Sequence, residues 1–180
     1  MSNTPSATIP RLLDEYERAI AHTATLWADL TPEEVAWRPH AESSAIGWHL
    51  GHQAAVAHFM IRNLTAAEPS LDPALDALMD GATPETDRGE LPTPERLGAY
   101  RDGVADRVRF RIGNIANGDV GAPAQLDAIA RTLLVAVVNH EYQHAQWIGE
   151  VRHRDLGRPP IAHPTSLLLT EIDGYCVLAG

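Results

Sequence analysis

The chain has 180 residues, of which 44% are hydrophobic, so it is long and apolar enough to bury the core of one compact domain. Its formal net charge is −10, and its 14 basic residues are scattered rather than clustered, which argues against a nucleic-acid partner. Cys176 is the single cysteine, so no disulfide can form within the chain and a reducing compartment is favoured.

The amino-terminal residues also bear on the compartment. Residues 1–10 lack the basic start and the apolar run of a signal peptide. No apolar stretch approaches the ~20 residues that a membrane-spanning helix requires. We therefore expect a cytoplasmic protein that has neither a membrane nor a nucleic acid as its partner.

The first half of the chain contains two long helical patterns. Residues 9–30 carry apolar side chains at helical spacing, which predicts the first long helix. The segment 31–34, Thr-Pro-Glu-Glu, has an N-cap residue, a proline at the first helical position and a carboxylate two positions later, so a short helical turn follows. Pro39 ends that turn. The second long helix is expected over about 44–66.

The second half contains two more long helices after an extended connection. Residues 68–92 are rich in Pro, Gly, Asp and Thr, with a short helical segment at 71–79, which indicates a long crossover between helices two and three. The third and fourth long helices are predicted over about 93–116 and 123–157. No alternating strand pattern stands out, so the tail after about 157 is expected to be mostly irregular. The prediction is one all-α domain over residues 1–180, a four-helix bundle.

Histidines on two of these helices indicate a metal site. His140 and His144 lie four positions apart within an apolar stripe, so both can reach one ion from the same helix face. A buried imidazole without a polar partner is costly, and a bound ion removes that cost. His52 and His49 are the candidates for the third ligand, because bundle sites are built from facing helices. Three histidines leave a coordination position for water or substrate, which is typical of catalytic sites.

Residues 140–144 also match the His-Glu-x-x-His pattern of zinc proteases, in which Glu141 would be the general base. The wider context argues against a protease. Trp147 and Glu150 occupy the positions of the glycine and the third histidine in the metzincin pattern, and no predicted strand offers an edge to a peptide. Glu141 is rotated ~100° from His140 on the helix, so a supporting or surface role competes with a catalytic one.

The remaining polar candidates are expected to be structural or exposed. Cys176 lies in a poorly patterned tail and is expected to be an inert thiol. Three tryptophans are expected in the core rather than in ligand stacking, and five further histidines are expected at the surface or its boundary. The tryptophans are Trp27, Trp48 and Trp147; the histidines are His22, His40, His58, His153 and His163.

Four segments, in this order along the chain, together resemble the DinB/YfiT-like superfamily of metal-binding four-helix bundles. They are Leu-Thr-Pro-Glu-Glu at 30–34 with Trp-Arg-Pro at 37–39, Ser-Ala-Ile-Gly-Trp-His-Leu-Gly-His at 44–52, His-Glu-Tyr-Gln-His at 140–144, and 152–160, which ends in Leu-Gly-Arg-Pro-Pro. The resemblance implies that His52, rather than His49, is the first metal ligand. It implies His140 and His144 as the other two.

This superfamily includes thiol-dependent transferases and isomerases and the amino-terminal domain of ergothioneine synthases. The stand-alone length fits the transferases, which implies a divalent metal, with zinc favoured and iron or nickel as alternatives, and a low-molecular-weight thiol cosubstrate. We predict a metal-dependent enzyme that activates a thiol or water for transfer to, or hydrolysis of, a small molecule. A non-catalytic binding bundle is one alternative. Oligomeric state is open, and a homodimer is compatible with a bundle of this size.

The ergothioneine-synthase branch is the second alternative, and it implies iron(II)-dependent oxidative sulfur chemistry. The form of the Trp48 motif and the His-Glu-x-x-His pair look closest to that branch. Gln146, however, stands where that branch has a carboxylate two residues after its last ligand. Imidazole ligands suit several divalent metals, so ligand type does not decide between the two chemistries.

Overall fold

The computed structural model describes residues 8–83 and 87–178. In this part of the chain, six helices are followed by a two-stranded antiparallel hairpin. The prediction of a mostly helical protein is therefore confirmed. The elements are α1 (Ile9–Trp27), α2 (Pro32–Val35), α3 (Ile46–Ile61), α4 (Pro73–Leu78), α5 (Pro94–Ala116), α6 (Pro123–Arg154), β1 (Leu169–Ile172) and β2 (Tyr175–Leu178).

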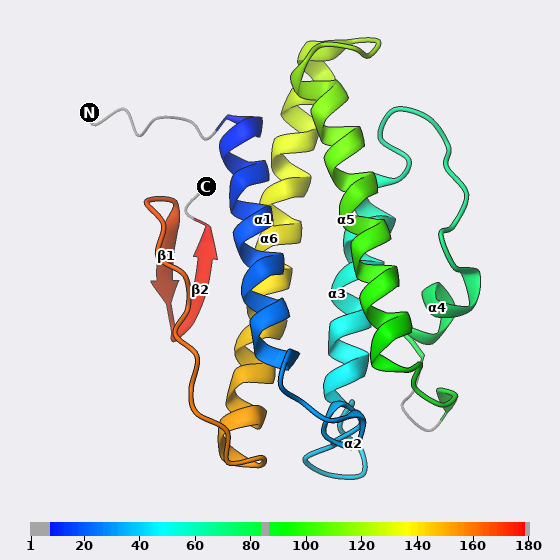
Figure 1. The fold of residues 1–180 in the computed structure, drawn as a ribbon. Helices are drawn as coiled ribbons and strands as arrows, with labels where there is room; N and C mark the ends of the chain where they lie inside the picture. Colours follow the sequence, from blue (N-terminus) through cyan, green and yellow to red (C-terminus); the bar gives the residue numbers. More distant parts are fainter. Residues whose placement is uncertain (1–7, 84–86, 179–180) are drawn as a thin grey trace.

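The four long helices α1, α3, α5 and α6 lie side by side (Figure 1). α6, with 32 residues, is the longest of them and packs against α1, α3 and the hairpin. α3 packs between α5 and α6, and the connection from α3 to α5 carries the short helix α4 along the outside of this pair. This arrangement places one face of α3 opposite one face of α6, where the predicted metal ligands lie.

Local signals set the starts of these helices. Before α2, the Thr31 hydroxyl accepts a hydrogen bond from the Glu34 amide at 3.3 Å, and the Glu34 carboxylate accepts one from the Thr31 amide at 2.9 Å. This is the capping box, which satisfies two amides that the helix leaves unpaired. Thr93 caps α5 with a single bond, in which its hydroxyl accepts from the Arg96 amide. Gly118, just beyond α5, has a φ of +76°, a conformation that favours glycine over residues with a Cβ.

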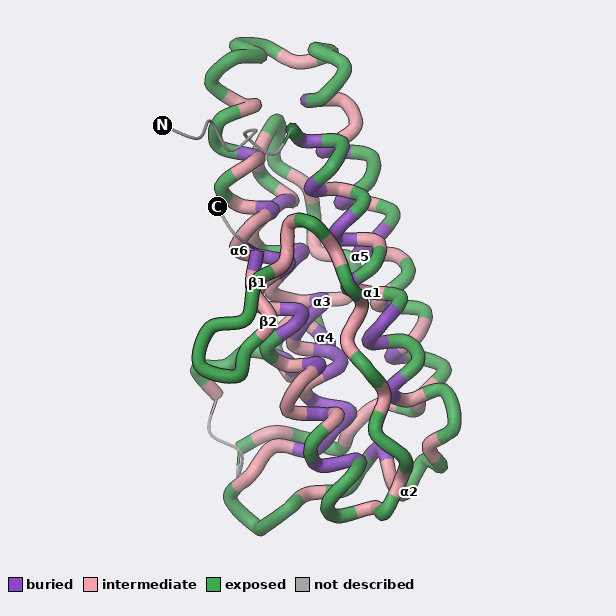
Figure 2. The backbone as a smooth tube through the Cα atoms, turned by 90° about the vertical axis from the view of Figure 1, so that its left-hand side faces the viewer, coloured by how far each residue is buried: buried purple, intermediate pink, exposed green. Residues whose placement is uncertain are grey.

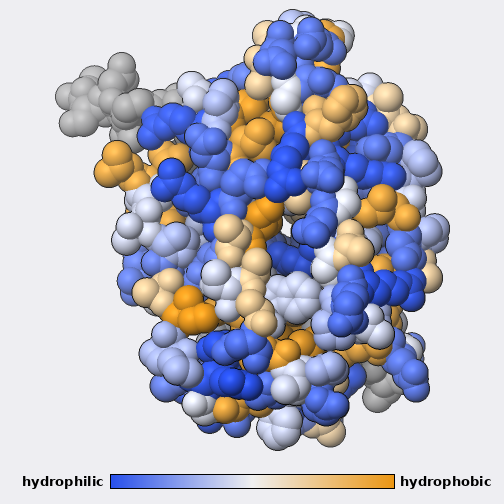
Figure 3. All heavy atoms as spheres, in the orientation of Figure 1, coloured by the Kyte–Doolittle hydropathy of each residue, from blue (hydrophilic) through white to orange (hydrophobic). Residues whose placement is uncertain are grey.

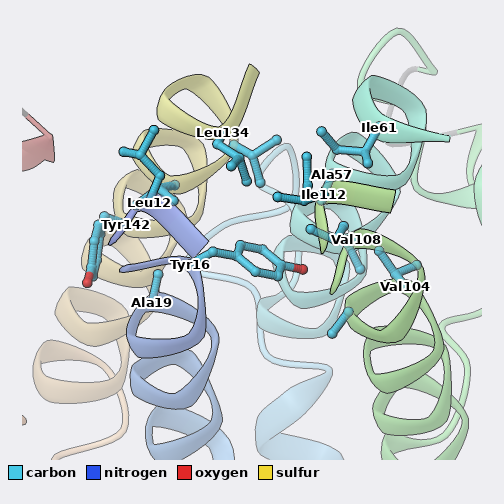
Figure 4. Packing of buried hydrophobic residues seen from close by; sticks show 14 of the residues in the cluster. Leu12, Tyr16, Ala19, Ala57, Ile61, Val104, Val108, Ile112, Leu134 and Tyr142 are labelled. Atoms are coloured by element: carbon cyan, nitrogen blue, oxygen red, sulfur yellow. The ribbon is translucent and has the colours of Figure 1, made fainter. Parts of the chain in front are cut away.

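The apolar core lies where the long helices face one another (Figure 2). Figure 4 shows side chains from all four helices meeting there: Leu12, Tyr16 and Ala19 of α1, Ala57 and Ile61 of α3, Val104, Val108 and Ile112 of α5, and Leu134 and Tyr142 of α6. Each of these residues is buried. Burial of this shared face holds the helices in fixed positions and thereby fixes the positions of the polar groups that project between them.

The face in Figure 3 is mostly hydrophilic, with hydrophobic residues scattered over it. Within the described residues, no helix is both long and apolar enough to cross a membrane.

Three features differ from the sequence predictions. The tail contains a hairpin that the alternation pattern did not reveal, in which Leu169 pairs with Leu178. His22 and His58, expected at the surface or its boundary, are buried. Polar neighbours make the burial of His58 possible: it accepts a hydrogen bond from Arg107 at 2.9 Å, and its other ring nitrogen faces a carboxylate of α4 at 3.8 Å.

Candidate metal centre

The structure brings His52 of α3 together with His140 and His144 of α6. One ring nitrogen from each lies within 4.8 Å of the others. Nε2 of His140 and Nε2 of His144 are 3.1 Å apart. All three side chains are half-buried, so they lie near the surface of the helical core without being freely solvated. The facing arrangement of α3 and α6 thus produces the cluster that the spacing and the resemblance predicted.

The contacts of His52 fix which of its nitrogens is free. Its Nδ1 lies 2.7 Å from the carbonyl oxygen of Met79. A carbonyl oxygen only accepts, so the Nδ1–H of His52 donates to it. The neutral ring then carries its lone pair on Nε2. The Trp48 ring stacks on the His52 ring, with centroids 4.4 Å apart and an angle of 14° between planes, which fixes the orientation of the imidazole.

His144 has a corresponding partner in His49, one turn before His52 on α3. The Nδ1 atoms of His49 and His144 are 2.7 Å apart, so one of them donates to the other. When Nε2 of His144 presents a lone pair, its Nδ1 carries the proton and donates to His49. The Trp147 ring lies against the His49 ring, with centroids 3.8 Å apart and an angle of 31° between the planes. The sequence left His49 as an alternative ligand, whereas the structure makes it a hydrogen-bond partner of a ligand candidate.

Electrostatics keep these imidazoles neutral. Burial lowers the pKa of His144 to about 2, and the neighbouring histidines add to the effect. Burial likewise lowers the pKa of His49 to about 3 and of His140 to about 4, and it also lowers the pKa of His52. At neutral pH the rings therefore offer lone pairs rather than positive charge, which is the form that binds a cation.

The donor set and spacing fit a divalent metal. Imidazole nitrogens bind zinc at 2.0–2.1 Å, so two of them in a tetrahedral site lie roughly 3.3 Å apart. The 3.1 Å between His140 and His144 is close to that separation. One ligand nitrogen from each of the three residues lies within 4.8 Å of the others, so the three imidazoles converge on a space of about the size of one ion. Hydrogen bonds at Nδ1 that orient ligating histidines are typical of metal sites.

A cavity of about 330 Å³ opens beside His52. It lies between α3 and the α4 connection, and His52 is the member of the triad that lines it. Gly81 faces the exposed edge of the ring, where a Cβ would lie 3.2 Å from Cε1 of His52. The absence of a side chain at this position keeps access to the imidazole open. A small molecule in the cavity would lie beside the candidate metal centre.

Glu141, the predicted general base, lies on a different face of α6. Its carboxylate is buried and accepts hydrogen bonds from Thr23 at 2.7 Å and from Arg101 at 2.6 Å. Gln53 of α3 donates to the Glu141 backbone carbonyl at 2.8 Å. Glu141 borders a separate cavity between α1 and α5. Its catalytic role stays a prediction, and its described contacts are those of a buried ion pair rather than those of a surface carboxylate.

Several of these contacts were not predicted from the sequence. The Met79 carbonyl comes from an irregular connection 27 residues after His52, so no periodic pattern marks it. The Arg101–Glu141 pair depends on how α5 faces α6. His49 had a signal, because it stands three positions before His52 on the same helix, and residues at that spacing share a face.

A helical fold that presents three facing histidines defines a candidate metal-binding protein, and comparison with known proteins supplies the family. The sequence profile of the DinB superfamily matches residues 15–148. The chain therefore belongs to the DinB superfamily. The matched region includes the three histidines, all of α3 and most of α6. A comparison with curated proteins found no match.

Proposed function

We propose that this DinB-superfamily protein is a metal-dependent enzyme that activates a low-molecular-weight thiol or water for attack on a small-molecule substrate. The observation that carries the proposal is the convergence of His52, His140 and His144, together with the contacts at Nδ1 of His52 and His144. We interpret the four long helices as the four-helix bundle of the superfamily and the α3–α5 connection as its crossover.

The residues of the chain contribute in three ways. The three neutral imidazoles hold a divalent cation without reducing its charge. The Met79 carbonyl and His49 keep the ligating nitrogens unprotonated and oriented. The cavity beside His52 receives the substrate. A divalent ion at such a site acts as a Lewis acid, which lowers the pKa of a bound thiol or water and yields a nucleophile at neutral pH.

The contacts of Gln146 favour the thiol or water chemistry over the oxidative iron chemistry. Its side chain donates to the Gly174 carbonyl at 2.6 Å and accepts from the Cys176 amide at 3.0 Å. These bonds hold Gln146 to the hairpin. The position where the ergothioneine-synthase branch has a carboxylate is therefore an amide with a structural role here.

Metal analysis of the purified protein tests the metal site. The wild type should retain about one equivalent of a divalent metal, and His144→Ala should lose most of it. His153→Ala is the matched control, because His153 is an exposed histidine on the same helix. Equal metal content in the wild type and His144→Ala would overturn the proposal.

Activity is tested on the same preparations. Metal-loaded protein is incubated with cellular thiols and an electrophile, and thiol consumption is followed. Consumption should require the metal and should be absent in His144→Ala. Metal binding without turnover of thiols or of hydrolysable esters would favour the alternative of a non-catalytic binding bundle. Activity that depends on iron(II) and oxygen and is lost with zinc would favour the oxidative alternative.

A further inference from the structure

The cavity beside His52 also contains a charged group with one buried hydrogen-bond donor that has no described partner. Arg62, the residue that caps α3, lines this cavity. Its Nε–H is buried and has no hydrogen-bond partner among the described residues. The recorded ion-pair partner of its guanidinium is Asp76, at 3.7 Å, which is longer than a hydrogen bond. A buried arginine donor without a partner is costly, and a ligand anion would remove that cost.

The acidic residues of the cavity are more fully engaged. Asp76 accepts hydrogen bonds from the hydroxyls of Tyr100, at 2.5 Å, and Ser70. Asp80 accepts from the Ala82 amide at 2.9 Å. Each carboxylate therefore has a hydrogen-bond donor within the protein while it keeps its charge, whereas the Nε–H of Arg62 has no acceptor among the described residues. An arginine guanidinium is planar and matches a carboxylate with two parallel hydrogen bonds.

The residues of α3 that line the cavity indicate the length and polarity of a ligand that would fit. His52, Val56, Phe59 and Arg62 follow one another at helical spacing on the side of α3 that lines the cavity. Ten residues of α-helix rise about 15 Å, which separates the backbones of His52 and Arg62 along the helix axis. Between them the lining from α3 is apolar, and Phe59 is 72% exposed. A volume of about 330 Å³ is at the lower end of the range for small-molecule sites.

We propose that this cavity binds small carboxylates with an apolar body, with the carboxylate on Arg62 and the reacting end toward His52. The substrate class of the enzyme would then be small organic acids. The claim that the reacting end of the ligand lies toward His52 rests on the proposed function. Carboxylate binding at Arg62 itself requires no metal. The two proposals can therefore fail separately.

The test is a titration of the full chain, zinc-loaded and metal-free, with hexanoate, 1-hexanol and hexylamine, which share one chain and differ in charge. ¹H–¹⁵N NMR gives the dissociation constants and reports directly on the Arg62 Nε–H resonance. Hexanoate should bind at least about tenfold tighter than hexanol and should shift that resonance. From butanoate to hexanoate, each buried methylene should tighten binding roughly fourfold. Tighter binding of hexylamine, or equal binding of all three, would overturn the inference.

Two variants locate the ligand. Arg62→Gln should weaken hexanoate binding by about tenfold or more and leave hexanol binding unchanged. Ala55→Leu keeps the charge but fills part of the cavity, and it should weaken both ligands. Arg154→Gln is the control, because Arg154 is an exposed arginine outside the cavity. If neither cavity variant changes hexanoate binding, the subsite is refuted whether or not the protein holds a metal.

Discussion

The buried pair of Arg101 and Glu141 gives the sharpest test of what Glu141 does. Their side chains are 10% and 3% exposed, and Nη2 of Arg101 lies 2.6 Å from Oε1 of Glu141. Arg101 also donates to the Leu50 carbonyl at 2.6 Å. Glu141→Gln keeps the shape of the side chain but removes its charge. The guanidinium is then left without a counter-charge in the core.

Removing one partner of a buried ion pair costs about 3–5 kcal/mol, and we expect the low end, because the glutamine oxygen can still accept a hydrogen bond. For a chain of this size, 1 kcal/mol lowers the melting temperature by about 2–4 °C. Glu141→Gln should therefore melt roughly 6–12 °C below the wild type. Circular dichroism melts, checked by urea unfolding, measure the effect.

Glu150→Gln is the matched control, since it is the same change on the same helix. Glu150 pairs with Arg154, and both side chains are exposed, so its loss should change stability by about 0.5 kcal/mol or less. In the double variant Arg101→Met with Glu141→Gln, part of the lost stability should return. A Glu141→Gln variant as stable as the wild type but without activity would refute this reasoning and support the general-base role.

Two further predictions concern the surroundings of the metal centre, and a third concerns a buried histidine of α1. His49→Phe keeps an aromatic ring against Trp147 but removes Nδ1. Chelator competition should show a metal affinity about 10- to 100-fold weaker than that of the wild type. An unchanged affinity would contradict the role of His49 in orienting His144. In Gly51→Ala the new Cβ would lie 2.4 Å from Sδ of the buried Met79, so urea unfolding of the metal-free protein should show a loss of about 1–3 kcal/mol, and no loss would mean that Met79 repacks freely. Burial, aided by a neighbouring histidine, lowers the pKa of His22 to about 4. As the pH falls, His22 is therefore protonated in the unfolded chain at a higher pH than in the folded protein. The free energy of unfolding should fall as the pH drops from about 6.5 toward 4. His22→Gln should show a smaller fall over that range, and an identical fall would contradict the assignment.

The helices could be predicted because their signals are local. The start of α5 was placed within a residue, since a threonine cap and a first-turn proline act over four residues. The ends of α1 and α3 were placed too late, at about 30 and 66 instead of Trp27 and Ile61. No glycine stops either helix, so its end depends on tertiary contacts that the apolar spacing does not encode.

The hairpin was missed because its contacts are distant in sequence. The Leu178 amide donates to Asn139 of α6 at 2.6 Å, so the second strand is held by a helix rather than by an alternating pattern of its own. One local signal was present. Asp173 and Gly174 stand between the strands with φ values of +52° and +82°, and Asp-Gly is a preferred pair for a two-residue hairpin turn.

Neighbouring residues of α6 show why part of the site could be predicted and part could not. His140 and Glu141 point to different sides of the helix, because one residue turns it by ~100°. On one side, the histidine spacing alone predicted two members of the triad, and the family pattern supplied His52. On the other side, the ion-pair partner of Glu141 is Arg101 of α5, and only the packed fold brings the two residues together. If Glu141 acts mainly through this ion pair, Glu141→Gln protein that remains folded should keep most of the metal affinity of the wild type, since the carboxylate makes none of the triad's described hydrogen bonds and acts on His140 only through its charge. A loss of affinity without unfolding would show that the two sides of α6 are coupled.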